Sequence, residues 1–132
     1  MNEQGLCILA VEDSPHDAFL LRMRLSKLAD AKFELLQVDR LSEALSLLSR
    51  RRVDLVLTDL NLPDSLGLDT VRTLVRTAAG VPVIVLFGCN TPEIGKQLSE
   101  AGACGHLSKD RLRSEELEQI IHAAVQRKAM PE

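Results

Sequence analysis

The stretch VLTDLNLPDS, from Val56 to Ser65, begins as an apolar run and changes abruptly at Asp59. Its apolar part is continuous rather than alternating, which is typical of a strand that is covered on both faces. A carboxylate at the end of such a strand is costly to bury without a partner. The partners of Asp59 have to come from elsewhere in the chain, so the arrangement of the other segments decides which residues can serve.

Apolar runs of the same kind recur along the chain. We expect these to be strands: Leu6 to Val11, Phe33 to Val38, Val53 to Thr58, Val81 to Phe87 and Cys104 to Leu107. Segments with apolar residues at helical spacing lie between and after them. Ser14 is an expected N-cap of the first helix, and Gly80 and Gly102 are expected to end the third and fourth. Strands that alternate with helices predict an α/β fold, a doubly wound, five-stranded parallel sheet between two layers of helices.

Length and composition predict one domain over residues 1–132, with 45% hydrophobic and 27% charged residues. No apolar stretch approaches the length of a membrane span, and the first residues lack the pattern of a secretory signal, so we expect a cytoplasmic protein without membrane contact. The net charge of −3 and the aromatic content of 2% argue against direct binding of nucleic acid.

Acidic residues follow two of the predicted strands. For the strand order 2-1-3-4-5, the ligand crevice lies beyond the carboxyl ends of the first and third strands. Glu12 and Asp13 end the first strand and Asp59 ends the third, so we expect these three carboxylates to meet. Lys109 follows the fifth strand at the same edge and can offer its ammonium group to a phosphate or a carboxylate.

Three carboxylates this close together repel one another unless a cation lies between them. A hard divalent ion with oxygen ligands, most plausibly Mg²⁺, would relieve the repulsion, so the cluster is predicted to be a magnesium site.

Other acids are expected to lie outside this site. Asp54 begins the third strand, some 16 Å from Asp59, and belongs to the opposite edge. Asp64 and Asp69 flank the start of the third helix and are expected to act there as cap or dipole acids.

With these residues placed, the sequence resembles the receiver domain of response regulators from bacterial two-component systems. The resemblance runs from about Leu6 to Arg127. It rests on VEDS after the first strand, VLTDLNLPDSLGLD at the third, VPVIVLFG at the fourth, and AGACGHLSKD at the fifth. It implies a flavodoxin-like strand order and a phosphorelay function.

The resemblance implies that Asp59 accepts a phosphoryl group from a histidine kinase or a histidine phosphotransfer protein. Mg²⁺ would be bound by Glu12, Asp13 and Asp59 and by the backbone carbonyl of Asn61. Lys109 would pair with the phosphoryl group, and Gly88 would keep the approach to Asp59 open. The first helix would then be the docking face for the kinase. The fourth helix, fifth strand and fifth helix would form the output surface.

Two positions depart from the family pattern. The family usually has Ser or Thr at the end of the fourth strand, where this chain has Phe87, whose ring cannot donate a hydrogen bond to the phosphoryl group. The family usually has Tyr or Phe where this chain has His106. These two residues occupy the switch positions. They motivate an alternative, a pseudo-receiver that serves as an interaction module with weak or absent switching.

A catalytic domain that acts on outside substrates, such as a magnesium phosphatase or a nuclease, is the third alternative. Such folds usually need a second acid two residues after the strand aspartate, and this chain has Asn61 there. We therefore expect a signalling domain rather than an enzyme. The sequence leaves open the identity of an output domain or effector protein and whether the chain forms a weak homodimer.

Overall fold

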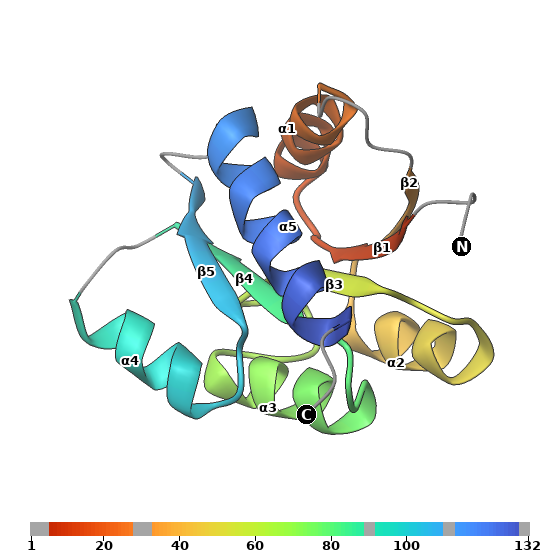
Figure 1. The fold of residues 1–132 in the computed structure, drawn as a ribbon. Coiled ribbons are helices and arrows are strands. Elements are labelled where there is room, and N and C mark those ends of the chain that lie inside the picture. Colours follow the sequence, from red (N-terminus) through yellow and green to blue (C-terminus); the bar gives the residue numbers. More distant parts are fainter. Residues whose placement is uncertain (1–5, 28–32, 89–91, 110–112, 130–132) are drawn as a thin grey trace.

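The computed structural model describes residues 6–27, 33–88, 92–109 and 113–129. Strands and helices alternate along them: β1 (Leu6–Val11), α1 (Pro15–Ser26), β2 (Phe33–Val38), α2 (Leu41–Arg50), β3 (Leu55–Asp59), α3 (Leu68–Thr77), β4 (Val83–Phe87), α4 (Pro92–Glu100), β5 (Gly105–Ser108) and α5 (Ser114–Ala129). The strands form one parallel sheet in the order β2-β1-β3-β4-β5. The predicted α/β fold and its strand order are confirmed (Figure 1).

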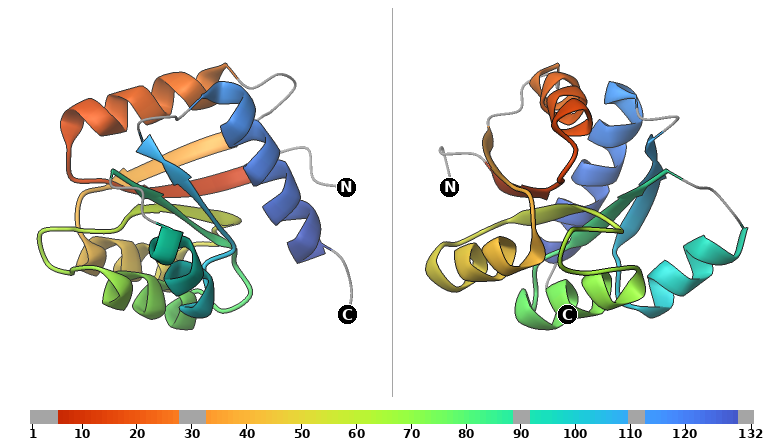
Figure 2. Two further views of the ribbon diagram at one scale, coloured as in Figure 1. Left: turned by 90° about the vertical axis from the view of Figure 1, so that its left-hand side faces the viewer. Right: turned by 180° about the vertical axis from the view of Figure 1, so that it is seen from behind.

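Helices cover both faces of the sheet. α1 and α5 lie on one face, and α2, α3 and α4 lie on the other (Figure 2). Side chains of β1 alternate between the two layers, because Ile8 and Ala10 pack in the α1 and α5 layer while Leu9 and Val11 pack in the opposite one. A strand buried on both faces needs apolar residues at every position, which explains the continuous apolar runs.

Strand boundaries differ from the predicted ones by one or two residues. β4 begins at Val83 rather than Val81, because Pro82 has no backbone N–H to donate to the ladder. β3 runs from Leu55 to Asp59 rather than from Val53 to Thr58, and β5 is displaced by one residue, to Gly105–Ser108. The shift in β3 makes Asp59 the last residue of the strand, so the backbone of the strand fixes its position.

Local chemistry sets the helix ends. Ser14 caps α1 as predicted, since its hydroxyl accepts a hydrogen bond of 3.2 Å from the backbone N–H of Asp17. Gly102 follows α4 with a φ of 107°, and a Cβ there would lie 2.8 Å from Val75 Cγ1, so both conformation and space favour glycine. Of the helices in the described ranges, none has the length and apolar character needed to cross a membrane.

Asp64 corrects one prediction. Its carboxylate accepts hydrogen bonds from the backbone N–H groups of Leu41, at 2.8 Å, and Ser42, at 2.9 Å. It therefore caps α2, not α3, and does so from the loop after β3. The N-cap residue of α2 is Arg40, whose side chain makes no cap hydrogen bond, so the donors at this helix start need an acceptor from elsewhere. Asp69 does lie in the first turn of α3, as expected.

Asp64→Ala should lower the free energy of unfolding by about 1 kcal/mol, because two backbone N–H groups of α2 lose their acceptor. Chemical denaturation of both proteins measures the difference. Asp39→Ala is the matched control, since Asp39 is an exposed acid that pairs with the exposed Arg40. Equal losses in the two variants would contradict the capping role of Asp64.

Candidate functional site

The acids from β1 and β3 meet at one edge of the sheet. Val11 at the end of β1 pairs in register with Thr58 of β3, so the residues that follow them lie side by side. One carboxylate oxygen each from Glu12, Asp13 and Asp59 lies within 4.8 Å of the other two. Glu12 is buried, Asp59 is partly buried, and Asp13 is exposed. The expected convergence of these three carboxylates is confirmed.

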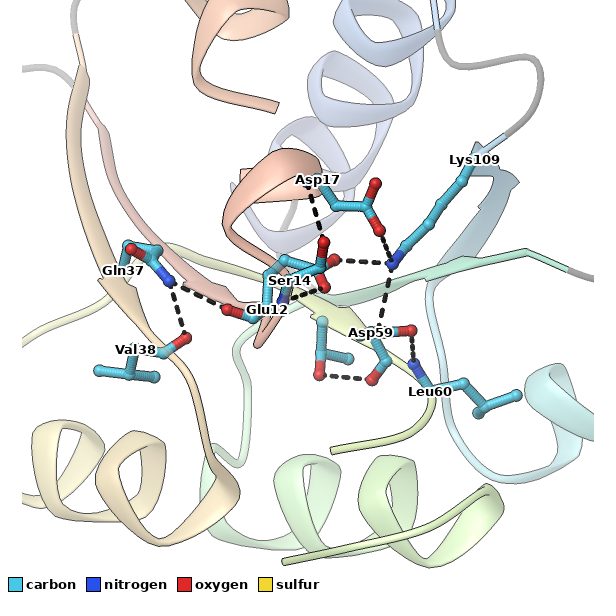
Figure 3. A network of polar contacts seen from close by, with 9 residues as sticks. Glu12, Ser14, Asp17, Gln37, Val38, Asp59, Leu60 and Lys109 are labelled. Carbon is cyan, nitrogen blue, oxygen red and sulfur yellow. Dashed lines mark hydrogen bonds and ion pairs between the residues drawn. The ribbon is translucent and has the colours of Figure 1, made fainter. Parts of the chain in front are cut away.

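Lys109, just after β5, extends into this acidic cluster. Its Nζ lies 2.8 Å from Glu12 Oε1, 3.0 Å from Asp17 Oδ2 and 3.2 Å from Asp59 Oδ2 (Figure 3). Its side chain is 19% exposed, so the ion pairs lie in a medium of lower dielectric than open solvent. The ammonium group expected at this edge thus balances part of the acidic charge.

Backbone N–H groups hold the carboxylates of Glu12 and Asp59, the two acids at strand ends that contact Lys109. Glu12 Oε2 accepts a hydrogen bond of 3.1 Å from the N–H of Ser14, and Asp59 Oδ1 accepts one of 2.7 Å from the N–H of Leu60. The side chain of Gln37, on β2, donates to the backbone carbonyl of Glu12 at 3.0 Å (Figure 3). The turn after β1 is therefore tied to β2, and Lys109 joins Glu12 to Asp59, which limits how far the acids can move apart.

The environment changes the proton affinity of Glu12 and of Lys109. Burial raises the pKa of the Glu12 carboxyl above its usual value, and hydrogen bonds from Lys109 and from Ser14 N–H oppose this rise only in part. Burial alone would lower the pKa of Lys109, but hydrogen bonds to Glu12 and Asp17 and the charge of Asp59 raise it well above its usual value. Lys109 is therefore fully charged at neutral pH.

Asn61 and Gly88 follow the ends of β3 and β4, at the same edge of the sheet as the acids. The side-chain oxygen of Asn61 accepts a hydrogen bond of 2.9 Å from Gly67 N–H, so this side chain shapes the loop after β3. That its backbone carbonyl binds a metal, as the family resemblance implies, stays a prediction. Gly88 is exposed, and a Cβ built on it would meet nothing within 4 Å. The space next to residue 88 is open, and its role in the approach to Asp59 stays a prediction.

The two switch positions lie on the face that packs against α4. Phe87 is 3% exposed and belongs to an apolar cluster with Val71, Val85 and Leu98. His106 is exposed, and its ring centroid lies 5.7 Å from that of Phe87. A Cβ on Gly95 of α4 would lie 3.0 Å from His106 Nε2, so the glycine leaves room for the imidazole. Phe87 therefore fills the core between the sheet and its helices instead of presenting a polar group to Asp59.

Asp17 is a member of the cluster that the sequence did not assign to the site. Its place in the first turn of α1 indicates helix stabilisation, and the structure adds the contact with Lys109. Its neighbour His16 is exposed on α1. The one available signal for Asp17 was that α1 begins directly after the acids of β1, which places its first turn at the same edge of the sheet.

The donors suit a hard divalent cation. Glu12, Asp13 and Asp59 offer oxygen only, the ligand type that Mg²⁺ and Ca²⁺ prefer, and their oxygens are close enough to share one ion. The exposed position of Asp13 leaves the cluster accessible from solvent. A cation bound there could keep positions for water or for phosphate oxygens.

Comparisons with known proteins agree with this geometry. Residues 8–122 match the family model described as the response regulator receiver domain. Response regulator protein PilR of Pseudomonas aeruginosa is 33% identical over 101 residues, which are 76% of this chain and 22% of PilR. The cell cycle transcriptional regulator CtrA of Caulobacter vibrioides is 29% identical over 120 residues, 91% of this chain and 50% of CtrA. The chain therefore spans half or less of the length of these relatives.

A solved structure shows the same architecture. The signal receiver domain of a modulated diguanylate cyclase from Desulfovibrio desulfuricans superposes with a TM-score of 0.78 and 26% sequence identity. The match covers 93% of this chain and 95% of that domain.

Lys109→Met should destabilise the protein in a pH-dependent way. The pKa of Glu12 is raised on folding, so the charged form of Glu12 lowers the free energy of unfolding above that pKa. Loss of the Lys109 ammonium group should lower it further. In metal-free buffer we expect a loss of about 2 kcal/mol near pH 7 and a smaller loss at lower pH, because protonated Glu12 no longer needs the ammonium group. Urea unfolding measures both values.

The matched control for this variant is Lys96→Met, at an exposed lysine of α4, which should change stability by less than about 0.5 kcal/mol at either pH. A loss in Lys109→Met that is the same at the lower pH and near pH 7 would show that Glu12 does not depend on Lys109 for its charge.

Proposed function

Because the chain belongs to the response regulator receiver domain family, we propose that Asp59 accepts a phosphoryl group from a histidine kinase or a histidine phosphotransfer protein. One observation carries the proposal. Asp59 lies at the end of a central strand with the carboxylates of Glu12 and Asp13 on one side and the ammonium group of Lys109 at 3.2 Å. This is a nucleophile surrounded by groups that can bind a cation and a phosphoryl oxygen.

In the proposed reaction, a carboxylate oxygen of Asp59 attacks the phosphorus atom of a phosphohistidine. A P–O bond to Asp59 forms, the P–N bond to the histidine breaks, and the imidazole leaves with the electron pair and takes up a proton from solvent. The transition state is loose, so positioning and charge neutralisation supply most of the rate. Lys109 contributes a fixed positive charge that can pair with a phosphoryl oxygen, while Leu60 N–H holds the second oxygen of Asp59.

We propose Mg²⁺ as the cofactor, held by the side chains of Glu12, Asp13 and Asp59 and by the carbonyl of Asn61. When bound, it would neutralise charge on the phosphoryl oxygens. The oxygen-only donor set supports this assignment.

The proposed partners are a histidine kinase or phosphotransfer protein at α1 and an effector or output domain at α4, β5 and α5, in a cytoplasmic pathway. Phe87 and His106 bear only on the conformational response that follows phosphorylation. Phe87 is buried in the apolar cluster of α3 and α4 and has no hydroxyl to offer the phosphoryl group. We propose that Asp59 is phosphorylated while the conformational response at β4 and β5 is weak or uses other contacts.

Incubation with acetyl phosphate and Mg²⁺ should add one phosphoryl group per chain, detected by intact mass spectrometry. Asp59→Asn should show no adduct, because its amide is a poor nucleophile, and Asp39→Asn should be labelled as the wild type is. Chelation of Mg²⁺ should suppress labelling of the wild type. Labelling of Asp59→Asn, or no labelling of the wild type, would refute the proposed function.

A further inference from the structure

Asp17 has a defined position at the edge of the site. It is in the first turn of α1, and its backbone N–H is held by the Ser14 hydroxyl at 3.2 Å. Its side chain, 34% exposed, reaches Lys109 Nζ at 3.0 Å, so α1 and the end of β5 are joined across 92 positions of sequence. The carboxylate thus points to the site rather than back to the start of its own helix (Figure 3).

The three carboxylates around Lys109 differ in their proposed roles. An ammonium group has three N–H donors, and Glu12, Asp17 and Asp59 each lie within hydrogen-bonding distance of it. Under the proposed function, Glu12 and Asp59 are also metal ligands, and Asp59 becomes the phosphoryl acceptor. Asp17 is the one carboxylate of the three that neither the metal nor the reaction requires.

Packing alone leaves the Lys109 side chain some freedom. A cavity of about 30 Å³ lies beside it, lined by Glu12, Asp17, Leu20, Leu21, Arg24 and Leu86. This is room for roughly one water molecule, so the packing around the lysine is not tight. A lysine side chain gives up considerable rotamer freedom when it is held in one place, and here ionic contacts have to hold it.

We infer that Asp17 is a positioning residue that holds the Lys109 ammonium group over Asp59 while metal and phosphoryl group engage Glu12 and Asp59. This inference rests on the proposed function, since it assigns Asp17 a role in the same reaction. It predicts that Asp17 affects phosphorylation only through Lys109. A purely structural role in α1 would act equally with and without the lysine.

The test compares rates of labelling by acetyl phosphate at saturating Mg²⁺. Asp17→Ala should be labelled about 3- to 10-fold more slowly, the range expected when one lysine regains part of its rotamer freedom. Asp17→Glu keeps the charge and should recover most of the rate. The Mg²⁺ concentration for half-maximal labelling should change less than about twofold, because Asp17 is not a ligand.

Asp69→Ala is the matched control. Asp69 also lies in the first turn of a helix, but it pairs with the exposed Arg72 at 3.3 Å. Loss of a favourable charge at a helix start is therefore common to both variants, and only Asp17→Ala should be slow. In a Lys109→Met background, Asp17→Ala should cause no further slowing. Equal slowing with and without Lys109 would overturn the inference.

A second readout does not require phosphorylation. NMR relaxation of the Lys109 side-chain carbon Cε should show a lower order parameter in Asp17→Ala than in the wild type or in Asp69→Ala. An unchanged order parameter would refute the positioning role. If the wild type is labelled normally and Asp17→Ala matches it, the inference alone fails. If the wild type is not labelled, the proposed function fails, and the relaxation measurement still decides whether Asp17 holds Lys109.

Discussion

The ion-pair cluster around the Lys109 ammonium group is the interaction on which the site depends. Glu12 is almost fully buried at the end of β1, and an unpaired carboxylate there would be strongly unfavourable. Lys109 lies 2.8 Å from Glu12 and 3.2 Å from Asp59, so one charge from β5 serves acids from two other strands. From the sequence we expected a divalent ion to offset the repulsion among these acids and Lys109 to lie at the same edge. The structure shows that the protein's own lysine shares this task.

The order of the sheet makes this cluster feasible. β1 and β3 are neighbours although α1, β2 and α2 separate them in sequence, so Glu12 and Asp59 arrive side by side. β5 lies at one edge, and Lys109 spans β4 to reach the acids (Figure 3). The loop after β3 is fixed by Asn61, which accepts from Gly67, and by Asp64, which caps α2. Polar contacts of the loops thus support the geometry around Asp59.

The fold and the main acids were predictable because they follow from local patterns. Continuous apolar runs predict buried parallel strands, and residues at the carboxyl ends of such strands share an edge. The sequence alone therefore predicted that Glu12, Asp13, Asp59 and Lys109 lie together. The contact of Asp17 with Lys109, the cap that Asp64 gives α2, and the space that Gly95 leaves for His106 were not predictable. Each depends on how far a side chain reaches between segments distant in sequence.

The most direct test of the account is a Mg²⁺ titration of the unphosphorylated protein followed by amide chemical shifts. The chain has no Trp or Tyr, so NMR is better suited than intrinsic fluorescence. We expect saturable shifts that are largest at residues 12–13 and 59–61 and extend to Lys109, and Glu12→Gln should weaken them. Shifts that do not saturate, or that spread over exposed acids such as Glu115 and Glu116 of α5, would contradict a cation site built from the ends of β1 and β3.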